Sequence, residues 1–434
     1  MKIAILGYGL QGKSSFEYWN KGNEVTICDQ NKIDNAPFNA KLKTGENYLR
    51  DLAEFDLIVR SPSIYPKDIV SSNDESILDK VTTNTNEFFK VCPSKNIIGV
   101  TGTKGKGTTS TLITKMLEAD GKTVHLGGNI GTPPLEMLKS GIKSDDWVIL
   151  ELANFQLIDI KYSPHIAVCL MVSEEHLDWH SNMDDYINAK KQLFIHQKPD
   201  DIAIFLGNNP ISESIVNVSQ GKKIPYLGRL GANVIGNEID IEGNKICGFN
   251  DIKLIGVHNQ ENICAAITAA WQITQNQKAL LSAIRAFTGL PHRLEIIKSS
   301  NNITYYNDSF ASAPEATLAA INSITNNKIM IIGGLDRNLN LDNLAIGIKQ
   351  NSFAIRKVVL IGQSASRVAA QLDNIGYTNY EICTAKTMEE IVDKAKSLAL
   401  PGDSIVLSPG FPSFDMFRNF EERGEKFRQV VTSL

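Results

Sequence analysis

The sequence is poor in the features that mark secreted, membrane and nucleic-acid-binding proteins. Only six cysteines occur in 434 residues and none forms a Cys-x-x-Cys pair, which argues against a zinc site or a disulfide framework and favours reduced thiols in the cytoplasm. No apolar run approaches the roughly 18 residues of a membrane helix. The apolar opening KIAILG passes at once into GYGLQGK, so we expect no signal peptide. The net charge of −4 indicates no general affinity for nucleic acid or anionic lipid.

Short β-branched runs, glycine turns and amphipathic stretches alternate along the whole chain. This alternation predicts an α/β fold with parallel sheets covered by helices, and the length predicts two to four domains. The expected strands fall in three blocks: KIAILG, EVTICD and DLIVR; NIIGV, TVHLGG, DWVILEL and HIAVCLMV; KIMIIGG, KVVLIG and DSIVL. We place domain boundaries at 91/92 and 290/291, and expect a peripheral sheet of the middle block within 208–251.

The first glycine-rich loop, GYGLQG at Gly7–Gly12, follows an expected strand and precedes a helix-like stretch. Asp29 ends the next expected strand about 20 residues further on, as in dinucleotide-binding folds. The glycines let backbone N–H groups approach a pyrophosphate at a helix N-terminus. The pattern predicts a Rossmann-like domain for a nucleotide-like phosphate, and by itself it leaves open both nicotinamide binding and a purely structural turn.

A second glycine-rich loop, GTKGKGTT, lies between the expected strand NIIGV and the expected helix TTSTLITKML. It departs from the common phosphate loop, since Val100 stands where the first Walker glycine would be and Gly107 follows Lys106. Lys106 can still reach the outer phosphates of a nucleoside triphosphate, and a threonine hydroxyl can complete a magnesium shell. The residues predicted to bind this nucleotide are Gly102, Thr103, Lys104, Gly105, Lys106, Gly107, Thr108 and Thr109.

This loop is the first of nine stretches that follow one another as in the Mur ligase family. The others are GGNIGTP (127–133), ELANFQL (151–157), EEHLDWH (174–180), YINAKKQLF (186–194), GVHNQENICAA (256–266), LPHRLE (290–295), NDSFASAPEAT (307–317) and SPGFPSFDMFRNFEERGEKF (408–427). The chain therefore resembles this family over essentially its whole length, and the last stretch is most similar to the glutamate-adding branch.

The resemblance implies three domains and one reaction. Residues 1–91 would form a Rossmann-like domain for a uridine diphosphate sugar, 92–290 a central phosphate-loop domain that binds ATP, and 291–434 a Rossmann-like domain that binds glutamate and closes over ATP. The enzyme would be an ATP-dependent carboxylate–amine ligase. Its expected substrates are UDP-N-acetylmuramoyl-L-alanine and glutamate, joined through an acyl phosphate with release of ADP and phosphate. We expect a cytoplasmic monomer without nucleic-acid or membrane partners.

By resemblance, four residues carry the chemistry. Lys106 would hold the outer phosphates of ATP. Glu151 and His176 would bind magnesium together with the hydroxyl of Thr108. Glu151 lies at the end of an expected strand and His176 after the next one, where α/β sheets present functional residues. Lys190 matches the family lysine that carries a carbamate, an anion that would help to hold a second magnesium ion. The alternative reading of Lys190 is a solvated lysine on a helix surface.

Further residues match positions of the family that bind substrates. Beyond the loop, the implied ATP contacts are Asn259, Asn262, Arg293 and Asp308. Arg293 would bind phosphate and Asp308 would bind the ribose. The uridine contacts implied are Leu10, Gln11, Asp29, Ser61 and Asn129. The glutamate contacts implied are Ser413, by a hydrogen bond, and Phe420, by packing. Family members commonly have SPG where this chain has SPS at 61–63, which puts a glycine turn there in question.

Two departures from the family bear on the substrates. Phe310 stands where many glutamate-adding members have a lysine that pairs with the amino-acid carboxylate, and Ser312 replaces a threonine. Because a neutral ring cannot replace an ammonium, we expect Arg337, in the turn GGLDRNL, to supply the cation. Gly107 replaces the usual Ser or Thr, and this pattern resembles folate polyglutamate synthases. In those enzymes the hydroxyl group that binds magnesium comes one residue later, which is Thr108 here.

Several alternatives stay open at this point. The Arg337 turn and the DSxxxxP pattern resemble a minority branch that adds L-glutamate, whereas SFDMFRNFEERG agrees with the common branch, so D-glutamate is favoured. A folylpolyglutamate synthase-like ligase would lack the N-terminal domain that contains Gly7–Asp29. A non-catalytic relative is disfavoured by the intact set Lys106, Glu151, His176 and Lys190, and an NAD dehydrogenase would leave the ligase stretches unexplained.

Overall fold

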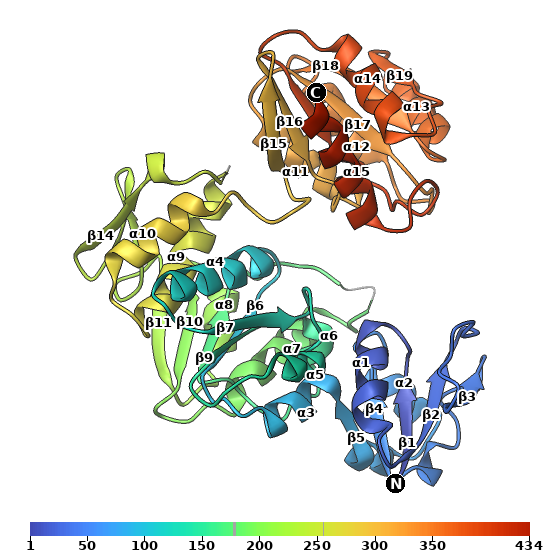
Figure 1. The fold of residues 1–434 in the computed structure, drawn as a ribbon, viewed down its shortest axis with the longest axis vertical. Helices are drawn as coiled ribbons and strands as arrows, with labels where there is room; N and C mark the ends of the chain where they lie inside the picture. Colours follow the sequence, from blue (N-terminus) through green and yellow to red (C-terminus); the bar gives the residue numbers. More distant parts are fainter. Residues whose placement is uncertain (177–178, 255) are drawn as a thin grey trace. The chain divides into compact units, whose positions relative to one another are not determined.

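The computed structural model describes residues 1–176, 179–254 and 256–434. The chain divides into two compact units, Met1–Lys253 with Val257–Phe287 and Leu254–Gly256 with Thr288–Leu434 (Figure 1). Both units are built on mainly parallel sheets whose strands alternate with helices, which confirms the predicted α/β class. No described helix is long and apolar enough to cross a membrane.

A five-stranded parallel sheet at the N-terminus has the strand order β3-β2-β1-β4-β5. Its strands are β1 Lys2–Leu6, β2 Glu24–Asp29, β3 Lys41–Thr44, β4 Leu57–Arg60 and β5 Val81–Thr83. Its helices are α1 Leu10–Trp19, α2 Pro66–Ser71 and α3 Asn84–Val91. The central strands are apolar runs because both faces of the sheet are covered. Ile3 packs into one core cluster and Ala4 into another, on opposite faces.

A six-stranded parallel sheet follows, with the order β11-β10-β9-β6-β8-β7. Its strands are β6 Ile97–Thr101, β7 Val124–Gly128, β8 Trp147–Glu151, β9 Ile166–Cys169, β10 Ile202–Leu206 and β11 Lys222–Tyr226. Its helices are α4 Lys106–Ala119, α5 Pro134–Met137, α6 Asn154–Leu157, α7 Met183–Ile195, α8 Pro210–Val216, α9 Val257–Trp271 and α10 Gln277–Ala286. β6 is buried along its whole length and leads directly into the second glycine-rich loop.

The peripheral sheet expected within 208–251 occupies only part of that region. Its three antiparallel strands are β12 Asn233–Ile235, β13 Glu238–Ile241 and β14 Asn244–Gly248. β11 instead pairs in parallel with β10 and becomes an edge strand of the main sheet.

The N-terminal and middle sheets share one hydrophobic core within the first unit. A single cluster of buried side chains runs from Ile3 and Phe88 to Val148 and Leu193. The predicted boundary at 91/92 therefore lies inside a compact unit, directly after α3. It stays a prediction, as does the boundary at 290/291.

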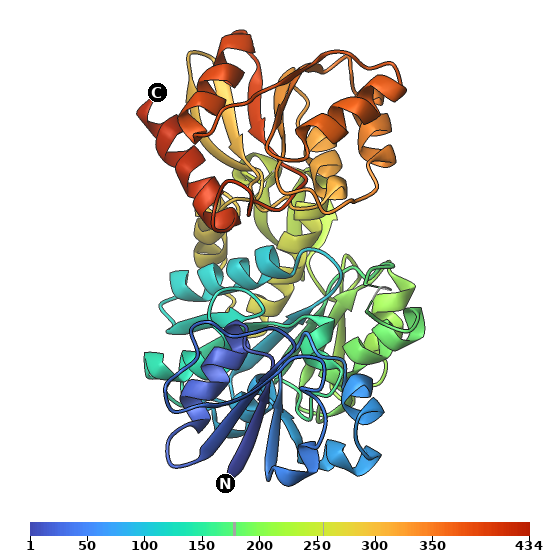
Figure 2. The ribbon, with the colours of Figure 1, turned by 90° about the vertical axis from the view of Figure 1, so that its right-hand side faces the viewer.

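The second unit has a six-stranded sheet with the order β15-β16-β20-β17-β18-β19, in which β15 is antiparallel to β16 and the other pairs are parallel. Its strands are β15 Glu295–Ser300, β16 Ile303–Asn307, β17 Lys328–Gly333, β18 Ile355–Ile361, β19 Tyr380–Ile382 and β20 Ser404–Leu407. Its helices are α11 Pro314–Ser323, α12 Asp342–Gln350, α13 Ala365–Asn374, α14 Met388–Leu398 and α15 Phe420–Ser433. Met330 packs with α11–α13 and Ile331 with α14–α15, so helices cover both faces (Figure 2).

Candidate active site

Three adjacent strands of the middle sheet end together at one edge. β6 pairs in parallel with both β8 and β9, so the residues that follow Thr101, Glu151 and Cys169 lie side by side. The second glycine-rich loop follows β6, helix α6 follows β8, and the segment 170–176 follows β9. This carboxyl edge is where open α/β sheets bind their ligands.

The second glycine-rich loop makes a left-handed turn before α4. Gly105 has φ +87° and precedes the helix as its N-cap, and a Cβ there would lie 2.1 Å from Asn262 Oδ1. Glycine adopts this dihedral angle without strain, whereas a larger residue would also have to displace the Asn262 side chain. Asn262, on α9, also donates to Asn259 Oδ1 at 3.0 Å, so both predicted asparagines lie next to the loop. The first N–H groups of α4 have no acceptor within the helix and, with the helix dipole, favour a phosphate.

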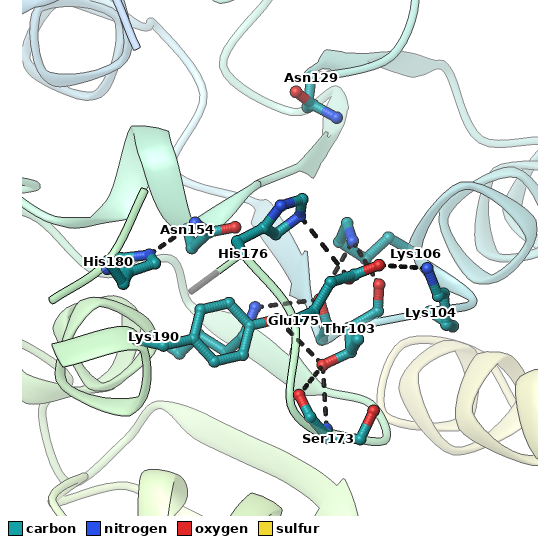
Figure 3. A network of polar contacts seen from close by, with 12 residues as sticks. Thr103, Lys104, Lys106, Asn129, Asn154, Ser173, Glu175, His176, His180 and Lys190 are labelled. Atoms are coloured by element: carbon teal, nitrogen blue, oxygen red, sulfur yellow. Dashed lines mark hydrogen bonds and ion pairs between the residues drawn. The ribbon is translucent and has the colours of Figure 1, made fainter. Parts of the chain in front are cut away.

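Two lysine side chains meet on the carbonyl oxygen of Gly102 (Figure 3). Lys106 Nζ donates to it at 3.1 Å and to Thr103 O at 3.0 Å, and Lys190 Nζ donates to it at 3.0 Å. Lys190, on α7, is fully buried, so the reading of a solvated surface lysine is wrong. Its Nζ lies 4.4 Å from the ring centroid of Tyr186. Burial first, and then the charge of Lys106, lower the pKa of Lys190 to about 7.

Glu151 ends β8 as a buried carboxylate with a neutral partner. It is 5% exposed, and its Oε1 accepts a hydrogen bond of 2.8 Å from Asn129 Nδ2. Within the described ranges no cationic side chain pairs with this carboxylate. A buried charge without a counter-charge is costly, so the position favours a bound cation. Asn129, predicted at the uridine group, thus touches the predicted metal ligand.

His176, Glu175 and Lys104 form a polar group beside the phosphate loop (Figure 3). Lys104 pairs with Glu175 Oε1, and His176 Nε2 lies 3.6 Å from Glu175 Oε2. His176 has φ +60°, a left-handed conformation that is uncommon outside glycine and clusters at functional turns. Its ring centroid lies 4.9 Å from that of Phe155. Residues 177–178 of the EEHLDWH stretch lie outside the described residues.

The threonine hydroxyls of the loop differ in their partners. Thr103 Oγ1 accepts the Ser173 N–H at 3.0 Å, so this predicted nucleotide ligand also ties the loop to the segment after β9. Thr109 Oγ1 is buried and, in the part of the chain that the structure describes, has no hydrogen-bond partner. The same holds for the hydroxyl of the next residue, Ser110. Thr108, the predicted metal ligand, is half-buried in the first turn of α4.

A pocket opens beside the first glycine-rich loop, in the first unit. Its lining residues are Gly9, Leu10, Gln11, Ser61, Pro62, Ser63, Gly128, Asn129, Gly131 and Pro133. It therefore brings together Leu10, Gln11, Ser61 and Asn129 of the set predicted for the uridine group. Gly12 lets α1 approach β1, since a Cβ there would lie 2.0 Å from the Gly7 carbonyl oxygen. This close packing is the reason for the third glycine in dinucleotide-binding loops.

Asp29, the fifth predicted uridine contact, is not among the pocket-lining residues. Its Oδ2 accepts the N–H of Tyr8 at 2.8 Å, so the carboxylate orders the glycine-rich loop. Ser61 supports the same loop, because its hydroxyl donates to Gly7 O at 2.9 Å. The SPS turn does not require a glycine, since Ser63 does not have a positive φ.

In the second unit, Asp308 directly follows β16 and is buried. Its Oδ2 accepts from the Ser408 hydroxyl at 2.7 Å and its Oδ1 from the Leu294 N–H at 3.1 Å. Burial raises the pKa of Asp308 to about 6. Both oxygens of this predicted ribose ligand thus also join neighbouring loops. Arg293 is exposed, and its guanidinium carbon lies 3.8 Å from the ring centroid of Phe310.

The loops that carry the predicted glutamate contacts are joined through their backbones. The Leu335 N–H donates to Pro412 O at 2.8 Å, which places the turn containing Arg337 beside the loop that contains Ser413. Arg337 is exposed, whereas Ser413 is buried and Phe420, the first residue of α15, is half-buried. A cation and a hydroxyl on neighbouring loops are suited to an amino-acid carboxylate.

Sequence reasoning missed a buried polar network between the N-terminal and middle sheets. Arg60 is 1% exposed and donates to both carboxylate oxygens of Asp159, at 2.7 and 2.6 Å, and to Ile64 O at 2.8 Å. His180 is also buried, and its Nε2 lies 2.7 Å from Asn154 Nδ2 (Figure 3). The signal for Arg60 was its place at the end of the apolar run DLIV, because arginine is almost never buried unless it is paired.

These features define an α/β nucleotide-binding protein. It has a phosphate loop at the end of a central parallel strand and a pocket beside the first glycine-rich loop. Two family models match the chain: the Mur ligase middle domain at residues 100–270 and the Mur ligase glutamate ligase domain at residues 292–411. The chain belongs to the Mur ligase family, which confirms the resemblance seen in the sequence.

Similar proteins agree with this assignment along the full length. A protein of Clostridium tetani named UDP-N-acetylmuramoylalanine–D-glutamate ligase is 34% identical, over 100% of this chain and 97% of its own length. One of Clostridium acetobutylicum with the same name is 34% identical, over 100% and 96%. Among solved structures, MurF of Acinetobacter baumannii aligns with a TM-score of 0.63 at 13% identity, over 99% of this chain and 93% of that one. MurC of Thermotoga maritima aligns with 0.59 at 16%, over 100% and 99%, and both confirm the fold.

Proposed function

We propose that this chain is an ATP-dependent ligase that joins D-glutamate to UDP-N-acetylmuramoyl-L-alanine in peptidoglycan synthesis. The observation that carries the proposal is the convergence of Lys106 and Lys190 on the Gly102 carbonyl, at the edge where Glu151 ends the neighbouring strand. Phosphoryl transfer needs positive charge and positioning more than covalent chemistry from the protein. The substrates are inferred from the names of the full-length relatives.

In the proposed reaction the alanine carboxylate attacks the γ-phosphorus of ATP. The bond from that phosphorus to the bridging oxygen breaks, so an acyl phosphate forms and ADP leaves. The neutral amine of glutamate then attacks the acyl carbon, the amide forms, and phosphate and a proton are released. Lys106 and the N–H groups of the first turn of α4 would neutralise and hold the outer phosphates. Asn259, Asn262, Arg293 and Asp308 are proposed as further ATP contacts.

Magnesium fits the donor set of this site. The Glu151 carboxylate is buried beside the neutral amide of Asn129, and Thr108 lies in the first turn of α4. Magnesium usually keeps several waters and is held by one or two protein carboxylates, and Glu151 would supply one. We propose Thr108, Glu151 and His176 as ligands. Magnesium there would neutralise charge on the transferring phosphoryl group.

Lys190 is proposed to carry a carbamate, as the family resemblance implies. A neutral amine attacks CO₂, a new N–C bond forms and a proton is released, which converts a cation into an anion. The surroundings of Lys190 favour the neutral amine, because the side chain is fully buried and shares its acceptor with the ammonium of Lys106. The resulting carboxylate would offer oxygen atoms to a second magnesium ion.

Incubation with ¹³C-bicarbonate is expected to give a carbamate carbon signal in the NMR spectrum of the wild-type protein. The signal should disappear in Lys190→Gln, because this variant has no amine at the buried position. Lys191→Gln is the matched control, one residue away on the same helix, and should keep the signal. A spectrum without the signal in the wild type, or one that keeps it in Lys190→Gln, would contradict the carbamate.

The stereochemistry of the glutamate is the finer part of the proposal. The names of the relatives favour the D-isomer. The departure at Phe310 removes the cation that many glutamate-adding members place there, and Arg337 is proposed to replace it beside the loop that contains Ser413. The monomeric state and the cytoplasmic location stay predictions.

Phosphate release from ATP in the presence of UDP-N-acetylmuramoyl-L-alanine is expected with D-glutamate and not with L-glutamate. Arg337→Ala should raise the KM for glutamate at least about tenfold, since a charge-assisted pair to a carboxylate would be lost. A preference for L-glutamate would place the chain in the minority branch. No release with either isomer, from a folded protein that binds ATP, would overturn the substrate assignment.

A further inference from the structure

Phe310 lies at the centre of a layered group of side chains in the second unit. The guanidinium carbon of Arg293 is 3.8 Å from the centroid of the Phe310 ring. On another side the same ring meets Phe420 edge-on, with the centroids 5.0 Å apart. A guanidinium this close to an aromatic face is attracted by the negative face of the ring. Phe310 is 40% exposed, so its ring serves as a platform at the surface more than as part of the core.

The backbone on both sides of Arg293 has a rare conformation. His292 has φ +63° and Leu294 has φ +43°, both left-handed, which is strained for side chains of this size. The turn is anchored by two hydrogen bonds, from the Phe310 N–H to His292 O at 3.0 Å and from the Leu294 N–H to Asp308 Oδ1 at 3.1 Å. Both bonds lead to the loop that carries Phe310. The arginine and its platform are therefore held by one connected piece of backbone.

We propose that Phe310 is a positioning residue, which holds the guanidinium of Arg293 ready for the phosphates of the nucleotide. The inference rests on the proposed function, because it takes Arg293 as a nucleotide ligand. Stacking restricts a long side chain before the ligand arrives, so less conformational entropy is lost on binding. Phe310 then has a role of its own at the position where many family members have a lysine. An ammonium at this position would repel the guanidinium that the ring attracts.

The test measures binding of the non-hydrolysable analogue AMP-PNP with magnesium to the full chain by titration calorimetry. Phe310→Leu keeps an apolar side chain but removes the aromatic face, and it is expected to weaken binding about 3- to 30-fold, the range of a cation–π contact. Phe310→Tyr and Phe310→Trp keep the face and should stay within about twofold of wild type. Phe353→Leu, at an exposed phenylalanine elsewhere in the unit, is the matched control.

A double-mutant cycle separates positioning from a general structural effect. Arg293→Ala is expected to weaken AMP-PNP binding by itself, and Phe310→Leu should add less than about twofold in that background, because the partner of the ring is already gone. Melting temperatures should differ little among the variants, since Phe310 is partly exposed. An effect of Phe310→Leu that is as large without Arg293 as with it would overturn the inference. So would equal losses in Phe310→Leu and Phe310→Tyr.

Failure of the inference and failure of the proposed function are distinguishable in this design. The inference is decided by nucleotide affinity, which is measured without turnover or amino acid. The proposed function is decided by phosphate release with UDP-N-acetylmuramoyl-L-alanine and glutamate. AMP-PNP affinity that is unchanged in Arg293→Ala would overturn the inference alone, since another phosphate ligand could still support the ligase.

Discussion

Lys106→Ala is expected to reduce phosphate release from ATP at least about 10³-fold, as for other groups that neutralise charge in phosphoryl transfer. Lys106 begins α4, and its ammonium lies on the carbonyl oxygens of Gly102 and Thr103, within the loop itself. In this position it can exchange two neutral acceptors for the outer phosphates of ATP. With alanine at this position, only the N–H groups of the helix would neutralise the charge of those phosphates. The measurement is steady-state phosphate release with all three substrates present.

The same variant should fold as the wild type does. Lys106 is half-buried and lies beside the buried Lys190, so its removal takes away a like charge, while Lys190 still donates to the Gly102 carbonyl. Circular dichroism and the denaturation midpoint should be close to wild type. Lys115→Ala, further along α4 at an exposed pair with Glu118, is the matched control and should keep full activity. Wild-type-like phosphate release in Lys106→Ala would refute the role of the loop.

Arg60→Ala is expected to lower the free energy of unfolding by about 3–5 kcal/mol, the usual loss when one partner of a buried ion pair is removed. The Arg60 guanidinium donates to both carboxylate oxygens of Asp159, to the carbonyls of Ser61 and Ile64, and to the carbonyl of Phe155 at 3.1 Å. The substitution leaves the Asp159 carboxylate and three carbonyl groups without their donor. Urea denaturation followed by fluorescence measures the loss.

The double variant Arg60→Ala/Asp159→Ala should be more stable than the sum of the single losses predicts, because no unpaired charge is left behind. Arg285→Ala, which breaks the exposed pair with Asp251, is the control and should leave the denaturation midpoint unchanged. Arg60 also holds the turn at Ser61, so the KM for the uridine-linked substrate should rise in Arg60→Ala. A midpoint equal to wild type in Arg60→Ala would show that the network contributes little.

Some features of the site could be predicted from the local sequence, and others could not. The apolar runs NIIGV and KIMIIGG predicted buried parallel strands, and β6 and β17 are buried along their whole length, since a strand covered on both faces needs no polar alternation. The turn before α4 could be predicted from its glycines, and Gly105 has φ +87°, a conformation that is strained for other residues. The burial of Lys190 could not be predicted, because the stretch YINAKKQLF does not indicate which of its two lysines faces the sheet.

The sequence by itself determined the fold class, the family and the residues with chemical capacity, because these depend on local patterns: apolar runs, glycine turns and the spacing of polar groups after strands. Only the tertiary structure decided which of those residues meet. Lys190 reaches the Gly102 carbonyl across 88 positions of the chain, Glu151 reaches Asn129 across 22, and Arg293 stacks on Phe310. Such contacts depend on how parallel strands are ordered in a sheet and how loops pack at its edge, which no local pattern specifies.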